Sequence, residues 1–356
     1  MKTEMSEKIV AQYKRFIHRR VWFMSITLLL LIGIAILSLI SGSANISLPS
    51  LFRVLTGNGD SFSSQIILSI RLPRVVGAVL AGTALAVSGA VIQSLLKNPL
   101  ASPFTLGISG AAAFGAAFAI IFLGAGSGYS GPADAAIINN PYAVTLSAFI
   151  WSLVSVVVIL FLSKYKGATP EIIILSGIII SSLFGAGISA MQYFSDDVQL
   201  AAIVFWTFGD MGRATWREAI IMSGVLIPVM AFFLQQSWNY KSLQSGDEYA
   251  RSLGVNVTRV RLTGMVAASL ATAVVVSFFG VIAFVGLVVP HIVRRIIGSD
   301  EHFVIPASAL FGGAFLLLSD TLARTALAPV IMPVGILTSF IGAPLFLFLL
   351  IRGMKR

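Results

Sequence analysis

Long apolar runs, separated by short polar or proline-rich segments, dominate the chain. A helix that crosses a bilayer needs about 20 mostly apolar residues, and the first such run extends from Trp22 to Ile40. Basic residues precede it as in a signal peptide, but the run is longer than a signal peptide's apolar region and ends in a poor cleavage site. We therefore expect a retained first span. Further spans are predicted at Pro73–Leu96, Phe104–Gly124, Tyr142–Ser163, Ile172–Phe194, Ala219–Leu234, Val304–Leu322 and Pro333–Ile351.

The apolar run from Leu262 to Val293 is too long for one span. Basic residues stand at both of its ends, and Gly280 lies inside it. If both basic ends are cytoplasmic, the run must cross the membrane twice. Two short spans that turn near Ser277–Gly280 satisfy this condition and bring the predicted total to ten.

The basic residues set the orientation of these spans. With the N-terminus inside, 18 of the 24 Lys and Arg residues fall on the inner side, whereas the acidic residues divide evenly. This is the bias that the positive-inside rule expects. We therefore predict cytoplasmic N- and C-termini. The longest inner loop is then 235–261, and the longest outer loops are 41–71 and 125–141.

The amino-acid composition excludes several classes of protein. Hydrophobic residues make up 57% of the chain and charged residues 11%, against about 45–50% and about 25% in soluble domains. This excludes a soluble enzyme, a disordered tail and a nucleic-acid-binding module. There is no cysteine, and the three histidines are scattered, so we expect neither a metal site nor a cofactor. Without a repeat or linker, residues 1–356 form a single all-α polytopic membrane domain, with a basic N-terminus (1–21) and a ten-helix bundle (22–351).

The chain also lacks the chemistry that would let it act alone. Ion-coupled transporters usually keep titratable residues inside the membrane, but here the deepest acidic residue, Asp320, is expected close to the outer surface. No phosphate-binding loop of the form G-x-x-x-x-G-K-[ST] occurs, and no hydrolase or metalloprotease motif is present. If this protein transports a solute, the energy comes from another polypeptide, and the chain itself is not an enzyme.

Two arginines stand at the predicted outer start of the second span, in the sequence Arg71-Leu72-Pro73-Arg74. Arginines near the end of a membrane helix often have no partner and only extend their charged ends to the water at the interface. Here they lie on the side where basic residues are scarce, and at a helix N-terminus, where the dipole disfavours cations. A specific anionic partner outside the membrane is the sharper interpretation.

The inner loop contains a segment with the pattern of a short helix. Ser245 and Glu248 have the spacing of a capping box, and Gly254 is placed to end the helix in a left-handed conformation. A helix of about two turns is too short to be stable alone. We expect it to pack against a partner through Ala250, Leu253 and Val255, although a surface helix without a partner is the alternative.

Several motifs in order carry a family resemblance. They are R-L-P-R, the run Gly77–Ala90, N-P-L-A-S-P with L-G-I-S-G-A, L-G-V after the inner helix, G-x-I-x-F-V-G-L-V-V-P-H-I-x-R, and P-V-G-I-L-T-S-F-I-G-A-P. Together they span residues 71–344. The chain resembles the permease family of ABC importers for iron-siderophore complexes, haem and cobalamin. The departures are a long basic N-terminus and a longer outer loop at 126–140.

The resemblance implies a BtuC-like type II ABC importer permease in the cytoplasmic membrane. Its partners would be a second permease copy (a homodimer or a close relative), two ATPase subunits inside, a solute-binding protein outside, and membrane lipid, but no nucleic acid. Similar permeases carry molybdate or tungstate, which leaves an oxyanion importer as an alternative, and a stand-alone transporter or channel is a second one. The implied site residues are Arg71, Arg74 and Arg324 for docking of the binding protein; Ser245, Glu248, Ala250, Arg251, Leu253 and Gly254 for ATPase coupling; and Ala168, Thr169, Pro170, Glu171, Gly177, Gly185, Gly187, Gly335 and Gly342 for the pore and gate.

Overall fold

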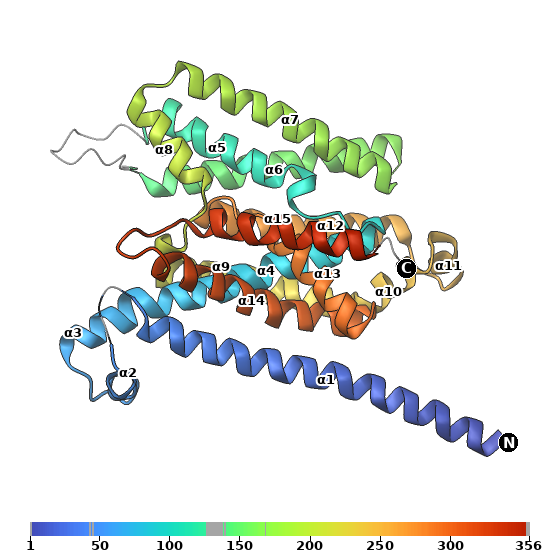
Figure 1. The fold of residues 1–356 in the computed structure, drawn as a ribbon. Coiled ribbons are helices and arrows are strands. Elements are labelled where there is room, and N and C mark those ends of the chain that lie inside the picture. Colours follow the sequence, from blue (N-terminus) through green and yellow to red (C-terminus); the bar gives the residue numbers. More distant parts are fainter. Residues whose placement is uncertain are drawn as a thin grey trace.

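The computed structural model describes residues 2–42, 44, 46–125, 138, 140–167 and 169–353. Every regular element in this part of the chain is a helix, which confirms the all-α fold class (Figure 1). The helices are α1 (Lys2–Ile40), α2 (Leu48–Leu55), α3 (Ser61–Ser64), η1 (Gln65–Arg71), α4 (Leu72–Leu96), η2 (Phe104–Leu106), α5 (Ile108–Phe122), α6 (Pro141–Lys166), α7 (Pro170–Phe194), α8 (Asp197–Thr207), η3 (Met211–Arg213), α9 (Trp216–Gln235), α10 (Ser237–Gln244), α11 (Asp247–Ser252), α12 (Val257–Phe279), α13 (Val285–Ile297), α14 (Glu301–Thr325) and α15 (Val334–Gly353).

Helix α4 forms the centre of the bundle, and α9, α12, α13 and α14 pack around it. Close packing is possible because small residues face one another, which is the usual basis of helix association inside membranes. A Cβ atom at Gly89 of α4 would overlap the backbone of Gly286 in α13, and one at Gly82 would overlap Gly312 in α14. The apolar stretch of α4 is therefore the most buried of the span candidates.

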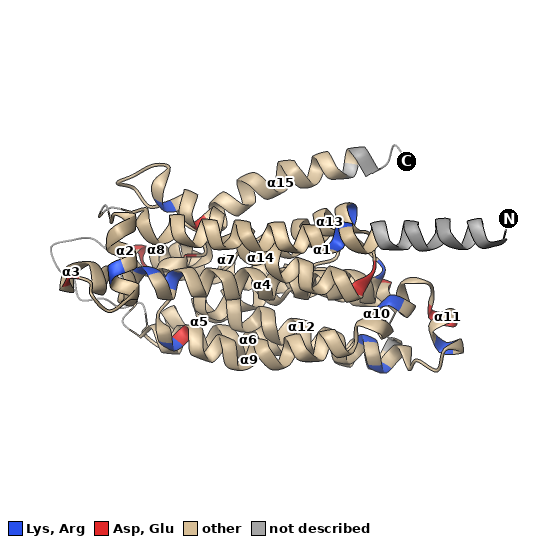
Figure 2. Ribbon diagram, turned by 90° about the horizontal axis from the view of Figure 1, so that it is seen from below, with Lys and Arg blue, Asp and Glu red and all other residues tan. Residues whose placement is uncertain are grey.

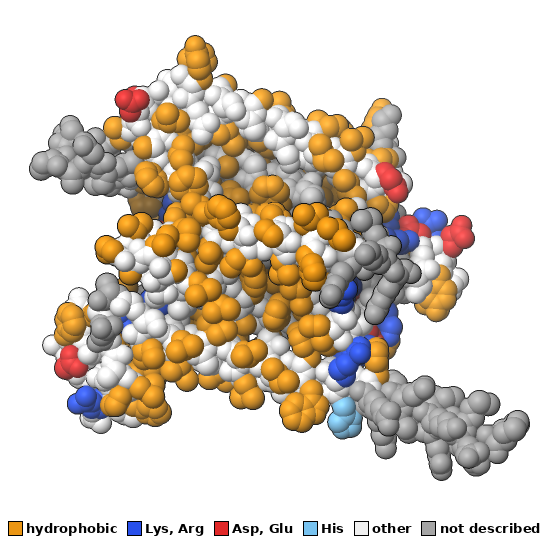
Figure 3. Space-filling model, viewed as in Figure 1, with side chains coloured by type: hydrophobic (Ala, Val, Ile, Leu, Met, Phe, Trp, Pro, Cys, Tyr) orange, Lys and Arg blue, Asp and Glu red, His pale blue; other side chains and the backbone are white. Residues whose placement is uncertain are grey.

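The two ends of the bundle differ from its sides. Helix α1 begins and α15 ends at the same end as α10 and α11, whereas α2 and α3 lie at the opposite end (Figure 1). Charged residues gather at the two ends, and the long middle section carries almost none in this view (Figure 2). Apolar side chains are spread over the long middle section of the face seen in Figure 3, where charged ones are almost absent. An apolar belt between two charged ends is what a bilayer requires.

Seven helices of the described chain are long and apolar enough to cross a membrane. Ten helices have 13 residues or more, namely α1, α4, α5, α6, α7, α9, α12, α13, α14 and α15. They coincide with the ten runs that the sequence singles out. Because α5 and α13 are shorter than a full span, the number of crossings and the side of the termini stay predictions.

The second predicted span begins earlier than the sequence analysis places it. A continuous helical stretch runs from Ser61 to Leu96 and changes to π-helical geometry at Gln65–Arg71. The backbone N–H of Leu72 donates to the carbonyl of Ile67, five residues earlier. Pro73, which has no N–H to donate, therefore lies inside the helical stretch rather than at its start. The argument that Arg71 and Arg74 stand at a helix N-terminus was wrong.

Candidate functional site

Arg71 and Arg324, at the end of the bundle that is predicted to be outer, point into the protein and bind backbone carbonyls. Arg71 donates from Nη1 to the carbonyl of Leu39 at 2.6 Å and from Nη2 to that of Ala44 at 2.5 Å. Arg324 of α14 donates from Nη1 to the carbonyl of Ser41 at 2.8 Å and from Nη2 to Ser38. The last carbonyls of a helix have no partner within it. These two arginines therefore cap the C-terminal end of α1, where cations are favoured by the helix dipole.

Arg74 forms a two-pronged ion pair with Asp320. Its Nε and Nη2 atoms lie 2.9 and 2.8 Å from the two carboxylate oxygens. Asp320 is fully buried, so the pair links α4 to α14 away from water. Arg324, four residues after Asp320 on α14, approaches the same carboxylate only to 3.9 Å. Asp210 offers Arg74 a second carboxylate at 3.8 Å.

The predicted docking role of Arg71, Arg74 and Arg324 concerns a complex and stays a prediction. In the isolated chain all three guanidinium groups have partners, and Arg71 is only 5% exposed. A carboxylate from outside would have to replace carbonyls of α1 or the Asp320 carboxylate. The residues are thus brought together as predicted, but as structural links between α1, α4 and α14.

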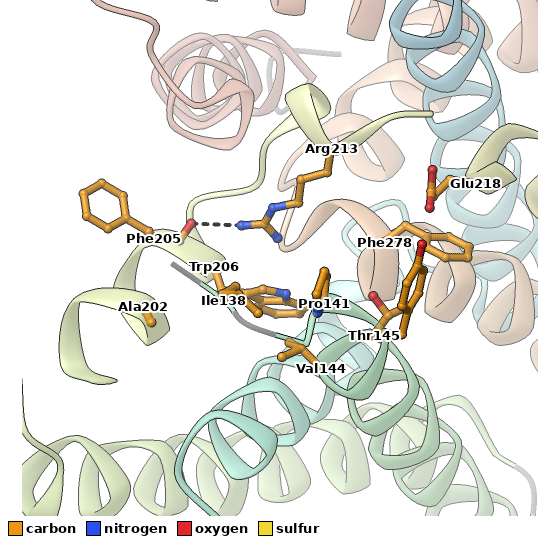
Figure 4. A pocket seen from close by; sticks show the side chains of 11 residues that line it. Ile138, Pro141, Val144, Thr145, Ala202, Phe205, Trp206, Arg213, Glu218 and Phe278 are labelled. Atoms are coloured by element: carbon orange, nitrogen blue, oxygen red, sulfur yellow. Dashed lines mark hydrogen bonds between the residues drawn. The ribbon is translucent and has the colours of Figure 1, made fainter. Parts of the chain in front are cut away.

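A cavity of about 340 Å³ lies at the same end, among α6, α8 and α9 (Figure 4). Arg213 projects into it, and its Nη2 donates to the carbonyl of Phe205 at 3.5 Å. Burial lowers the pKa of the Arg213 guanidinium, and the nearby carboxylate of Asp210 opposes this. Glu218, on the opposite wall, forms a capping box with Thr215. This outer cavity has mixed charge and aromatic walls.

A second group of cavities lies along the face of α15 and the segment between α12 and α13. One of about 470 Å³ and one of about 190 Å³ share Phe104 and Ala283 in their walls. Of the described residues that line them, none is charged. These two cavities are referred to below as the apolar cavities.

The predicted pore glycines fall into two groups. A side chain at Gly335 would overlap the carbonyl oxygen of Phe208, and one at Gly342 would overlap Phe284, so both glycines permit close packing beside the apolar cavities. A side chain at Gly177 of α7 would likewise overlap the carbonyl oxygen of Thr105, and one at Gly187 would overlap the ring of Phe114. Gly185 differs, because no atom lies within 4 Å of the position a side chain would take.

The segment predicted to form the inner gate, 168–171, lies at the start of α7. Thr169 caps the helix, since its Oγ1 accepts from the N–H of Ile172 at 3.5 Å, and Pro170 occupies the first turn. Glu171 follows and is exposed. Ala168 lies outside the described residues. No contact in the described structure assigns this segment a gating role.

The inner loop contains the predicted short helix, but its start differs. Helix α11 begins at Asp247 with Gly246 as the N-terminal cap, and no side chain caps it. The capping box of Ser245 and Glu248 was therefore wrong, because Gly246, with φ of +129°, starts the helix one residue later. Ala250 is fully buried against the rest of the loop rather than offered to a partner.

The end of this helix agrees with the prediction. Gly254 has φ of +80°, and its N–H donates to Arg251 while that of Val255 donates to Ala250. This is a Schellman motif, which favours glycine at this position. Tyr249 and Leu253 are 53% and 57% exposed and lie beside a groove of about 350 Å³ that Trp238 also lines. The apolar surface therefore contains Leu253 and Val255 as predicted, joined by Tyr249 and Trp238, whereas Ala250 does not belong to it.

Ion pairs fasten the inner loop to the bundle. Asp247 lies 2.6 Å from Nζ of Lys97, at the end of α4, and 3.1 Å from Nη2 of Arg261 in α12. Burial raises the pKa of Asp247, but the hydrogen bond from Lys97 and the charge of Arg261 outweigh it, so the pKa lies below its usual value. The carboxylate therefore remains charged and paired at neutral pH.

Sequence reasoning missed a buried polar cluster next to this loop. Glu301, at the start of α14, accepts hydrogen bonds from Arg294 of α13 and from Gln244 of α10. Arg294 also donates to the carbonyl of Ala90 at 2.8 Å and to Ser94 at 2.9 Å. The only signal in the sequence was the pair of basic residues Arg294 and Arg295 ahead of a turn. The cluster joins α4, α10, α13 and α14.

Fold and site together indicate a multi-pass membrane transport protein. Over the described residues, an all-helical bundle with uncharged cavities and a short helix in one end loop fits an ABC importer permease. Residues 29–352 match the model of the FecCD transport family, and the chain belongs to that family. Permeases of this kind are the membrane subunits of ABC importers and work with ATPases and a binding protein.

Individual relatives agree with this assignment. The chain is 51% identical to "Putative ABC transporter permease protein MJ0087" of Methanocaldococcus jannaschii, over 98% of this chain and 99% of the relative. It is 42% identical to the hemin transport system permease protein HmuU of Yersinia pestis, over 92% and 95%. Among solved structures it resembles one described as "An inward-facing conformation of a putative metal-chelate type ABC transporter", with a TM-score of 0.80 and 31% identity over 92% of this chain and 98% of that one.

Proposed function

We propose that this permease carries a metal chelate, namely an iron-siderophore complex, haem or cobalamin, into the cytoplasm. The observation that carries the proposal is that none of the described residues lining the apolar cavities is charged. A bulky chelate presents a largely organic surface, so an uncharged path lets it pass without strong binding. An oxyanion such as molybdate would instead favour cationic groups along the path, whereas the polar groups of the described walls are uncharged Ser and Thr hydroxyls.

The transporting unit in this proposal is a dimer. Helices α7 and α15 are the two that the family resemblance implies near its axis, and both carry large apolar side chains that stay exposed in the single chain, among them Leu183, Phe194 and Phe340. The close-packing glycines Gly335 and Gly342 lie on the same helix as Phe340. A second copy of this chain, or a close relative, would cover these side chains and complete the apolar cavities.

The inner and outer ends meet different partners. The ATPase subunit would seat on α11, where Tyr249, Leu253 and Trp238 form an exposed apolar surface beside a groove. The solute-binding protein would dock at the outer end, with acidic groups directed at Arg71, Arg74 and Arg324. Because these arginines already hold α1 and Asp320, docking requires an exchange of partners at this surface.

Comparison of cargoes tests the proposed substrate class. The permease and its ATPase, reconstituted in vesicles with the cognate binding protein, are given radiolabelled ferric siderophore, haemin, cobalamin and molybdate in parallel. We expect ATP-dependent uptake of at least one of the three chelates and none of molybdate. Uptake of molybdate alone would contradict the proposal.

A further inference from the structure

The connection between α12 and α13 leaves helical geometry inside the membrane. Helix α13 has 13 residues, and at 1.5 Å per residue it is about 20 Å long, against about 30 Å for the apolar core of a bilayer. On the proposed orientation its last turn, with Arg294 and Arg295, is cytoplasmic, so its first residue lies at depth. Residues 280–284 cover the remaining distance without helical structure. Such backbone is tolerated at membrane depth only where it is buried or lines a cavity.

Phe284 stands at this point in a strained conformation. Its φ is +67°, and apart from Lys97 no other non-glycine residue in the described chain has a positive φ. A bulky residue rarely adopts left-handed geometry, and such outliers persist where the surrounding structure enforces them, often at switch regions. The other positive-φ residue, Lys97, ends α4 in an ordinary helix cap.

Phe284 lies between a cavity and the closely packed helix α15. Phe284 is half-buried and lines the smaller apolar cavity together with Phe104 and Pro103. Its Cβ faces Gly342 of α15, where a side chain would overlap it. Two aromatic rings thus share one cavity at the start of α13, and a glycine leaves room for one of them.

The other end of α13 is tied to the coupling loop. Arg294, in its last turn, and Gln244, the last residue of α10, both donate to Oε1 of Glu301. Helix α11 begins three residues after Gln244. A displacement of the loop therefore reaches α13 through one carboxylate, and α13, which contains Pro290, is one helix from its last turn to its N-terminal cap Phe284.

We propose that Phe284 is the gate of the pathway, and that α13 moves it in response to the coupling loop. In the closed position its ring lies beside Phe104 and blocks the smaller apolar cavity. When α13 shifts, the backbone at Phe284 leaves the left-handed region and the ring withdraws. The inference rests on the proposed transport function, but it does not depend on which chelate is carried.

Leakage of a trapped dye tests the gate without a substrate. The permease–ATPase complex is reconstituted in vesicles filled with calcein, and efflux is followed without ATP. Phe284→Ala removes the ring and should raise efflux several-fold over wild type. Phe161→Ala, which removes an exposed ring from α6, should leave efflux unchanged. Efflux equal to wild type from an assembled Phe284→Ala complex would overturn the gate.

Two further variants keep the test decisive. Phe284→Trp retains an aromatic ring, so efflux of the dye should stay low while ATP-driven uptake slows several-fold. Normal uptake by this variant would refute the proposal even if Phe284→Ala failed to assemble.

Gln244→Ala cuts the link to Glu301 and should lower the uptake per ATP hydrolysed without raising efflux of the dye. An unchanged ratio of uptake to ATP hydrolysis would refute the role of α13. If efflux responds as expected but none of the chelates is transported, the gate stands and the proposed function fails.

Discussion

Removal of the Asp320 carboxylate should be the most damaging single change at the outer end. Asp320 is fully buried and holds Arg74 through two hydrogen bonds of 2.8 and 2.9 Å. In Asp320→Ala the Arg74 guanidinium stays largely buried with its main partner gone. Breaking a buried ion pair in this way costs about 3–5 kcal/mol. We expect the lower end of that range, because Asp210 lies 3.8 Å from Arg74 and is partly exposed.

A double-mutant cycle measures this coupling. The free energy of unfolding is determined in mixed micelles by titration with denaturing detergent, with the fluorescence of the five tryptophans as the signal. Asp320→Ala should lose about 3 kcal/mol, whereas Arg74→Ala/Asp320→Ala should lose less than the sum of the two single variants. Arg53→Ala, at an exposed position, should stay within about 0.5 kcal/mol of wild type. Additive losses, or an Asp320→Ala protein as stable as wild type, would refute the structural role of the pair.

Three shorter predictions concern other parts of the molecule. Gly254→Val places a β-branched residue at φ of +80°, so it should distort the end of α11 and lower uptake per ATP hydrolysed, measured in proteoliposomes; an unchanged ratio would remove α11 from coupling. Because the pKa of Asp247 is depressed, its ion pairs should hold the loop at any pH above the usual Asp value of about 4 and be lost as pH falls through the lower folded value. Hydrogen exchange of α11 should then rise only in that acidic range, and Asp247→Asn should raise it at neutral pH as well. Gly177→Val would drive a side chain into the carbonyl of Thr105 and should abolish assembly of α7 against η2, seen as loss of the monodisperse peak in size-exclusion chromatography; retention of that peak would contradict the close approach.

The helices could be predicted from the sequence because the apolar runs are long and the basic residues mark their ends. The turn near Gly280 was predicted for the same reason, since charge at both ends requires a return. The non-helical stretch before α13 was not predictable from the apolar run, which continues unbroken through residues 281–284. Hydropathy does not distinguish extended backbone that lines a cavity from helix.

The contacts of the charged residues were less predictable. The partners of Arg324 on α1 lie more than 280 residues away in the chain, and no local spacing reveals them. The capping box at Ser245 failed because a glycine within it offered another start for the helix. By contrast, the left-handed Gly254 follows from local chemistry alone, and it was predicted correctly.

Dependence of uptake on ATP tests the central claim most directly. Purified permease is reconstituted with and without its ATPase subunits, the binding protein and a labelled chelate are supplied outside, and the label that accumulates inside is counted. The account predicts accumulation against a gradient only when ATPase and ATP are both present, and no flux through the wild-type permease alone. Flux of the chelate down its gradient through the permease alone, at a rate unaffected by ATP, would identify a channel or secondary transporter and contradict the account.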